Sequence, residues 1–192
     1  MSIGNKPALE QLFAHDPLTV ARDLLGAFLS VNGCGGRIVE TEAYRHDDPA
    51  SHSFRGQTIR NRSMFGPSGT VYVYRSYGIH WCLNFVCGSD QKGGAVLIRA
   101  LEPTVGLHEM QQRRGTANVL RLCSGPGRLT EALGIDGTFD GLPLSHSPLK
   151  LSLSEGARPA LAIGCRIGIT QAIEMPWRFG VTNSPFLSRR FG

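Results

Sequence analysis

Two carboxylates and a phenol alternate along one short stretch of the sequence, and these groups could do acid–base chemistry. Residues 37–44 have the period-two pattern of a β-strand, so Glu40, Glu42 and Tyr44 are expected on one side together with Ile38. Burial raises the pKa of a carboxyl group, which makes a buried glutamate a stronger general base that can activate water. Spacing alone fits Glu40 and Glu42 equally well, and the ordinary alternative for each is a solvated or ion-paired strand residue.

More side chains that could line a site follow along the chain, namely His52, Tyr74, Tyr77, Asn84 and Arg99. Several rings together with an amide suggest a slot for a flat ring, and a carboxylate beside that slot could activate water. The ordinary alternatives are a surface group in a loop for His52 and a hydrogen-bonding strand residue for Asn84. The spacing of these residues therefore suggests a site without establishing it.

A β-hairpin is expected over residues 69–86, because two alternating apolar runs meet at residues 75–78. Tyr72 and Tyr74 share one face of its first strand, and Tyr77 lies at its tip beside an arginine. An exposed tyrosine at a hairpin tip does little for the stability of a monomer, which suggests contact with another molecule. The alternative is a ring that folds back onto its own sheet.

Other elements must hold these residues in place. A helix is expected at 17–25, with Asp16 as its N-cap and Gly26 as its stop. Residues 45–67 are polar and have neither the helical nor the strand period. They are therefore expected to form an ordered loop, rich in side chains that can bind a ligand. A further helix is expected at 107–114, and another short one follows residues 125–127 and ends at 133. Further strands are expected at 27–31, 95–101, 149–153, 160–169 and 177–181, and turns or loops at 32–36, 88–94 and 136–148.

A charged residue interrupts the apolar strand expected at 95–101. Alternation places Arg99 on the same side as Leu97 and Leu101. A charge within an apolar strand needs a partner, so Arg99 is expected to have one.

Length and composition indicate one soluble domain over residues 1–192, with a short N-terminal tail at 1–15. The sequence has no apolar run of membrane-spanning length and no signal-peptide pattern, so a protein of the cytoplasm or nucleoid is expected. Five scattered cysteines without a Cys-x-x-Cys pair lack the ligand spacing of a zinc site or an iron–sulfur cluster. No metal or other cofactor is expected.

The charge balance fits a polyanionic partner. The formal net charge is +5, and only Lys6, Lys92 and Lys150 are lysines, so 17 of the 20 basic residues are arginines. A planar guanidinium suits phosphates and stacking better than an ammonium group does. High genomic GC content is an alternative reason for this excess of arginine.

The order and composition of several segments resemble the alkyladenine (3-methyladenine, methylpurine) DNA glycosylase family. These segments are GRIVETEAY at 36–44, ASHS at 50–53, RNRSMF at 60–65, YVY at 72–74, YG at 77–78, CLN at 82–84, LIRALEP at 97–103, LCSGP at 122–126 and PWRF at 176–179. They occur in order and cover nearly the whole chain after the N-terminal tail, so the resemblance is specific.

The resemblance implies a mixed α/β (α+β) fold in a single compact domain. That fold has a curved, mainly antiparallel sheet flanked by helices, and a protruding β-hairpin that intercalates into DNA. The implied activity is base-excision repair. Alkylated or deaminated purines, of the 3-methyladenine, 7-methylguanine and hypoxanthine class, are flipped out of double-stranded DNA and released by hydrolysis, which leaves an abasic site. The enzyme is expected to act as a monomer.

The resemblance also implies a role for each candidate residue. Glu42 matches the general base, and this decides between Glu42 and Glu40. Asn84 matches the group that obstructs the 2-amino group of guanine, and Arg99 matches a residue near the catalytic water and the DNA backbone. Tyr44, His52 and Tyr74 match the rings that sandwich the flipped base. Tyr77 matches the hairpin residue that intercalates into the duplex.

Three arginines of the loop and hairpin, Arg60, Arg62 and Arg75, are expected to hold phosphates without reading sequence. None of the three lysines lies in the similar segments, so no Schiff base and no lyase activity are expected. Two positions depart from the family pattern. Ile59 affects the loop, and Arg75-Ser76 affects the tip of the hairpin that carries the intercalating Tyr77. A damaged-DNA-binding protein without catalysis and a hydrolase of free nucleosides are the alternative functions.

Overall fold

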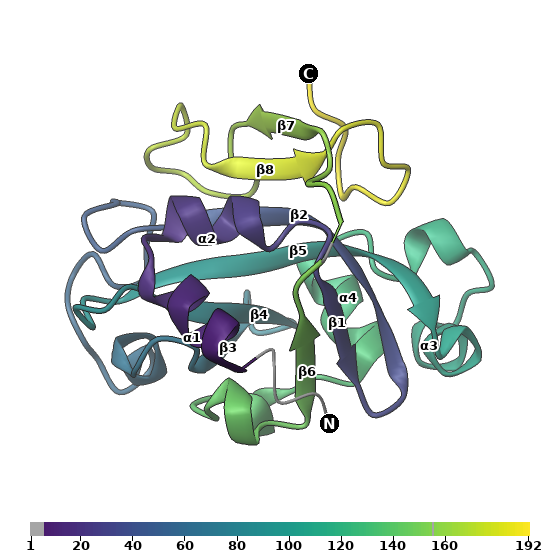
Figure 1. Ribbon diagram of the computed structural model, residues 1–192, viewed down its shortest axis with the longest axis horizontal. Coiled ribbons are helices and arrows are strands. Elements are labelled where there is room, and N and C mark those ends of the chain that lie inside the picture. The colour runs from purple at the N-terminus through teal and green to yellow at the C-terminus, as the bar shows by residue number, and fades with distance from the viewer. Residues whose placement is uncertain (1–5, 155) are drawn as a thin grey trace.

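A curled antiparallel sheet runs through the molecule, and helices pack beside it (Figure 1). The computed structural model describes residues 6–154 and 156–192. Its strands are β1 (Phe28–Val31), β2 (Cys34–Tyr44), β3 (Val71–Ser76), β4 (His80–Cys87), β5 (Gly94–Val105), β6 (Leu149–Ser152), β7 (Leu161–Gly164) and β8 (Arg178–Val181). The helices are α1 (Lys6–Ala14), α2 (Pro17–Asp23), α3 (Leu107–Arg114) and α4 (Pro126–Leu133), and the 3₁₀ turns are η2 (Arg62–Phe65), η3 (Val119–Arg121), η4 (Gly137–Phe139) and η5 (Leu144–His146).

The sheet has the strand order β3-β4-β5-β2-β1-β6, and β8 also pairs with β2 and with β7. The long strand β2 pairs with β5 along one edge, while β1 and β8 follow each other along its other edge. Every pairing between these strands is antiparallel. The expected mixed α/β fold in one compact domain is confirmed. No helix in the described part of the chain is long and apolar enough to cross a membrane.

Helix α2 begins where the sequence predicts it. Asp16 is the N-cap: its carboxylate accepts hydrogen bonds from the backbone N–H groups of Leu18 (2.9 Å) and Thr19 (3.3 Å). The expected tail at 1–15 is helical in part, because α1 covers Lys6–Ala14 and buries Leu12 and Phe13 in the core. The first five residues lie outside the described part of the chain.

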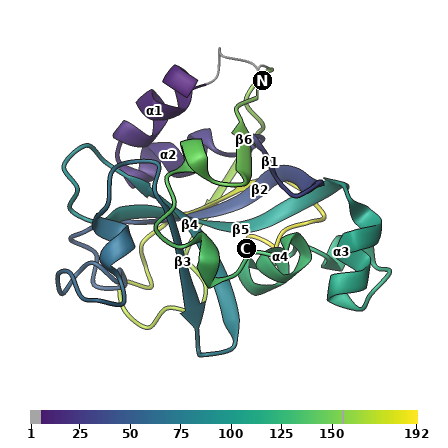
Figure 2. The same ribbon diagram turned by 90° about the horizontal axis from the view of Figure 1, so that it is seen from below.

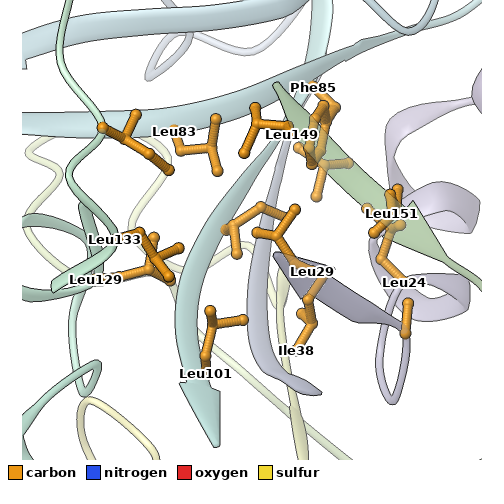
Figure 3. Close-up of a cluster of buried hydrophobic side chains, with 14 of the residues drawn as sticks. Leu24, Leu29, Ile38, Leu83, Phe85, Leu101, Leu129, Leu133, Leu149 and Leu151 are labelled. Carbon is orange, nitrogen blue, oxygen red and sulfur yellow. The ribbon is translucent and has the colours of Figure 1, made fainter. Parts of the chain in front are cut away.

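One face of the sheet carries the main hydrophobic core. Leu24, directly after α2, and Leu129 and Leu133 of α4 belong to this core together with Leu83 and Phe85 of β4, and Figure 3 shows the cluster. A smaller cluster on the opposite face consists of Met64, Tyr72, Val86 and Ala95, with Tyr44, Phe65 and Tyr74 against it. Polar strand residues gather on that second face, and the candidate site lies there.

Two expectations about strand faces are wrong, and β-bulges are the reason. The β2–β5 register shifts between Ile38 and Glu40 and again between Glu40 and Thr41. A bulge adds a residue to one strand and so reverses the alternation beyond it. Ile38 therefore lies in the main core and not beside Glu40, and Leu101 lies in that core and not beside Arg99.

Several element boundaries also differ from the expected ones. Asn32 and Gly33 form a two-residue turn with φ of 49° and 81°, so β2 begins at Cys34 and not after residue 36. The strand expected at 160–169 is limited to β7, because Arg166 leaves the sheet to pair with buried Asp48.

Candidate active site

The register of the sheet places a row of candidate residues side by side. Tyr72 of β3 is opposite Asn84 of β4, Asn84 is opposite Leu97 of β5, Leu97 is opposite Glu42 of β2, and Glu42 is opposite Arg178 of β8. Residues directly opposite each other in a sheet point to the same face. Antiparallel pairing thus brings together side chains from five strands that are distant in sequence.

An open cavity of about 980 Å³ lies over this row. Its wall contains most of the residues singled out in the sequence, namely Tyr44, His52, Arg60, Tyr74, Tyr77, Asn84 and Arg99. Loop residues 167–171 and residues 124–128 at the start of α4 complete the wall. The structure therefore gathers residues from both halves of the chain around one hollow.

Three rings form one side of the cavity. The ring of Tyr74 contacts that of His52 edge-on, with centroids 4.5 Å apart, and stacks on Tyr72 at 5.5 Å. His52 Nδ1 and the Tyr72 hydroxyl are 2.9 Å apart, which fixes the imidazole. Desolvation, followed by the nearby charge of Arg60, lowers the pKa of His52. A neutral imidazole with fixed orientation therefore joins Tyr74 as one wall of a slot.

Glu42 is fully buried and is not one of the described residues that line the cavity; it lies behind the wall, in contact with residues that do line it. One carboxylate oxygen accepts the backbone N–H of Ile167 at 2.9 Å, and the other accepts the Tyr44 hydroxyl at 2.9 Å. Arg99 Nη1 is 3.3 Å from Glu42. Burial raises the pKa of Glu42, against the opposing effect of the Arg99 charge. A carboxylate with raised pKa beside a cavity is an effective general base near neutral pH.

Tyr44 connects the slot with this carboxylate. Burial, and then the negative charge of Glu42, raise the pKa of Tyr44 well above its usual value. Its hydroxyl therefore stays protonated and donates to Glu42. The guanidinium of Arg166 lies over the Tyr44 ring at 4.7 Å and over Trp177 at 5.0 Å. The ring of Tyr44 is thus held between the cavity and a buried cation.

Glu40 has a different environment, although it is also fully buried. It accepts hydrogen bonds from Arg178 Nε (2.6 Å), from the backbone N–H of Ser188 (2.6 Å) and from the Ser188 hydroxyl (2.8 Å). Arg99 Nε is 3.4 Å from Glu40, so the expected partner of Arg99 is a pair of glutamates. Most of the acceptor capacity of Glu40 is therefore in use.

Asn84 is held in one orientation at the floor of the cavity. Its Nδ2 donates to the carbonyl oxygens of Tyr72 (3.1 Å) and Cys82 (3.3 Å), and its side chain is buried. With the amino group bound to the backbone, the amide cannot rotate freely. Asn84 therefore gives the floor a fixed shape.

The pair of strands β3 and β4 ends at the edge of the molecule away from α1 (Figure 2). Tyr77 in the connecting turn is 85% exposed and has φ of 50°, and Gly78 has φ of 69°. The backbone N–H of Ile79 donates to Ser76 O at 3.0 Å and closes the turn. Ile79 is also exposed, so the turn presents a ring and an aliphatic side chain to solvent.

The expected phosphate contacts are only partly near the cavity. Arg60 lines it and donates to Arg75 O at 3.2 Å. Arg62 and Arg75 are not among the described residues that line it, and the Arg75 guanidinium lies over Trp81 at 5.4 Å. The sequence interpretation did not single out further basic residues of the wall, which are Arg114, Arg128 and Arg189. For Arg128, its place in the first turn of a predicted helix was an available signal.

Arg166 is a second residue that sequence reasoning missed. It is buried in an ion pair with Asp48, and its Nη1 also donates to Ala43 O at 3.1 Å. This pair ties the loop that contains Ile167 to β2. Nothing in the local sequence marks Arg166, because its partner is 118 residues away.

The cavity has rings on one side, a buried carboxylate behind its wall and several arginines in the wall. These features fit a hydrolase whose substrate carries a flat ring and negative charge. The methylpurine-DNA glycosylase family model matches residues 11–185. The chain is 55% identical over 187 residues to a protein of Nitrosospira multiformis, covering 97% of this chain and 95% of the relative. It is 56% identical over 179 residues to a protein of Rhizobium meliloti, which covers 93% of this chain and 95% of the relative.

Both relatives carry the name "Putative 3-methyladenine DNA glycosylase". The chain belongs to the methylpurine-DNA glycosylase family, which confirms the resemblance seen in its sequence. It is accordingly a DNA-binding hydrolase of base-excision repair.

Proposed function

We propose that this protein releases alkylated and deaminated purines, including 3-methyladenine, 7-methylguanine and hypoxanthine, from double-stranded DNA and leaves an abasic site. The observation that carries the proposal is the position of Glu42. Its carboxylate is fully buried, yet it contacts Tyr44, Ile167 and Arg99, which all line the cavity. A one-step hydrolysis needs one general base, and Glu42 would fill that role.

In the proposed reaction, Glu42 takes a proton from a water molecule as the water oxygen bonds to C1′ of the flipped nucleotide. The bond between C1′ and the purine nitrogen breaks, and its electron pair leaves with the base. An N-alkylated purine carries a positive charge, so this electron pair neutralises it and the base departs readily. Hypoxanthine is neutral, so it would leave with the electron pair as an anion and take up a proton from solvent. Arg99 would bind the developing negative charge of the water and the adjacent backbone.

The base would lie between Tyr44 on one side and the edge-on pair of His52 and Tyr74 on the other. Electron-rich rings attract a cationic base by cation–π interaction. The fixed amide of Asn84 would obstruct the exocyclic 2-amino group of ordinary guanine. Selection would therefore combine the charge of the damaged base with exclusion of an undamaged one.

The turn between β3 and β4 would act as a wedge. Extruding a nucleotide costs a few kcal/mol of stacking and pairing, and less for a damaged base. Tyr77 is exposed, as is Ile79 two residues later, so the ring could enter the gap in the duplex and delay the return of the base. Arg60 at the cavity, and Arg62 and Arg75 farther out, would hold the phosphates.

A one-step hydrolysis without lyase activity fits the distribution of lysines. A lyase step needs an amine that forms a Schiff base with C1′. Lys92 lies in the turn between β4 and β5 and Lys150 on β6, and neither is part of the described cavity wall. Action as a monomer in the nucleoid is part of the proposal.

The test is incubation with duplexes that each contain one defined lesion. The account predicts free base and an alkali-labile abasic site, with no strand break before alkali treatment. Strand cleavage without alkali would contradict the monofunctional step. Tight binding of lesion DNA without base release would favour a non-catalytic damaged-DNA-binding protein, and release from free nucleosides alone would favour a nucleoside hydrolase.

A further inference from the structure

Glu40 is a fully buried carboxylate that the proposed reaction does not use, and it lies two residues before Glu42 on β2. A carboxylate is costly to bury and needs partners. Here Arg178 of β8 supplies one donor, and Ser188 supplies its backbone N–H and its hydroxyl. The partners of Glu40 therefore come from the last strand and from the segment that follows it.

Ser188 also contacts the arginine of the active site. Its hydroxyl donates to Glu40 Oε1 at 2.8 Å and accepts from Arg99 Nε at 3.0 Å. Arg99 itself is 3.4 Å from Glu40 and 3.3 Å from Glu42. The Ser188 hydroxyl thus bridges Arg99 and Glu40, and neither carboxylate holds Arg99 in a short ion pair.

Segment 184–192 is anchored so that Ser188 keeps this place. The Arg178 side chain donates to Arg189 O, and its guanidinium lies over the Phe191 ring at 3.9 Å. Gly164 and Gly180 provide room for that ring, because a Cβ at Gly180 would be 2.5 Å from Phe191. Backbone, cation and ring contacts together fix the segment against β7 and β8.

We propose that Glu40 and Ser188 are positioning residues for the hydrolytic step, which divide the charge of Arg99 between two carboxylates and so leave Glu42 free to act as the base. The inference rests on the proposed role of Glu42. The charges of Glu40 and Glu42 are balanced by those of Arg99 and Arg178. Arg99 therefore interacts with both carboxylates and does not pair with Glu42 alone.

Other groups that face Glu42 would not replace this effect. On its own strand it faces Glu40 and the protonated hydroxyl of Tyr44, and the loop after β7 contributes the Ile167 N–H and the guanidinium of Arg166 behind Tyr44. Tyr74 of β3 and Cys82 of β4 are both kept protonated, because burial raises their pKa values. Arg178 of β8 lies opposite Glu42, but its Nε donates to Glu40. Arg99 is therefore the cation whose position controls Glu42 most directly.

The two positioning residues should act in opposite directions on the pH dependence. In Glu40→Gln the whole charge of Arg99 is available to Glu42, so the pKa of Glu42 falls. The acidic limb of the pH–rate profile should then move to lower pH by about one unit. In Ser188→Ala, Arg99 Nε can close directly on Glu40, Glu42 loses part of this cation, and the limb should move to higher pH.

The experiment is single-turnover base release from a hypoxanthine-containing duplex, measured across pH for both variants and the wild type. Ser184→Ala is the matched control, since Ser184 lies in the same segment and its hydroxyl accepts the N–H of nearby Phe186. It should keep the wild-type profile. Ser188→Thr retains a hydroxyl and should restore the wild-type limb.

A purely structural role would reduce the active fraction without moving the limb, and unmoved limbs in Ser188→Ala and Glu40→Gln would overturn the inference. Shifts of both variants in the same direction would overturn it as well. If Glu40→Gln does not fold, because Arg178 is left unpaired, the direction of the Ser188→Ala shift decides alone. A Glu42→Gln arm separates the two claims: retained excision there refutes the proposed function, whereas lost excision with unmoved limbs refutes the inference alone.

Discussion

Glu40 and Glu42 are the same residue type on the same strand, and their surroundings give them different chemistry. Glu40 is bound by Arg178 and twice by Ser188, whereas Glu42 has single hydrogen bonds from Tyr44 and Ile167 and shares Arg99. The less saturated carboxylate is the better base. Sequence spacing could not separate the two, because their difference depends on groups more than 120 residues away.

At the same scale, Asn84 offers a test of selectivity. Replacing it by serine, Asn84→Ser, removes the amide that obstructs the cavity floor, so release of undamaged guanine should rise measurably above the wild-type background. The loss of the hydrogen bonds to Tyr72 and Cys82 should cost about 1 kcal/mol each in stability. Guanine release from undamaged duplex, measured beside hypoxanthine release, checks the prediction. Unchanged guanine release would argue that another group excludes this base.

Among the elements, the turn between β3 and β4 combines exposure with backbone strain. A tyrosine with φ of 50° occupies a conformation that asparagine and glycine adopt more easily. Strain of this kind is retained where a side chain is needed for function. The turn therefore favours a binding role for Tyr77 over a stabilising one.

The variant Tyr77→Asn should fold at least as stably as the wild type and bind damaged DNA about tenfold more weakly, since base–aromatic stacking contributes about 1–3 kcal/mol. Thermal unfolding and binding to a duplex with an abasic site measure the two effects. Tyr77→Phe keeps the ring and should retain affinity. Equal affinity in all three proteins would exclude the wedge.

The buried pair of Asp48 and Arg166 is the second element-scale feature, because it fastens the loop that carries Ile167. Asp48→Ala should destabilise the fold by about 3–5 kcal/mol, since it leaves a buried cation unpaired. The double variant Asp48→Ala with Arg166→Met should recover part of this loss. Urea unfolding provides the measurement, with Asp47→Asn of the exposed Arg45 pair as the control that changes little. A loss in Asp48→Ala no larger than in this control would contradict the account.

Strand and helix periodicity predicted most elements, including α3 with its observed bounds and the two strands of the β3–β4 pair. Helix α1 was missed although Leu9, Leu12 and Phe13 have helical spacing, because the pattern is short. The β2–β5 bulges have no local sequence signal, so the faces of Ile38 and Leu101 were assigned incorrectly. The roles of the site residues followed from the family resemblance and not from the pattern of any strand.

For the whole molecule, the net charge of +5 predicts DNA binding that weakens with salt. Arg60→Ala and Arg128→Ala, both at the cavity wall, should each lower the slope of log affinity against log salt concentration by about 1. Arg37 is exposed and donates to Gly26 O outside this wall, so Arg37→Ala is the matched control. Binding titrations at several salt concentrations provide the slopes. Equal slopes for all three variants would place the DNA elsewhere on the surface.

The central claim is that Glu42 activates the water that releases the base. The most direct measurement is single-turnover base release by Glu42→Gln from a hypoxanthine duplex, together with the affinity for the same duplex. The account predicts a rate at least about 100-fold below that of the wild type, the usual minimum contribution of a general base, with affinity retained. Base release at the wild-type rate would contradict it.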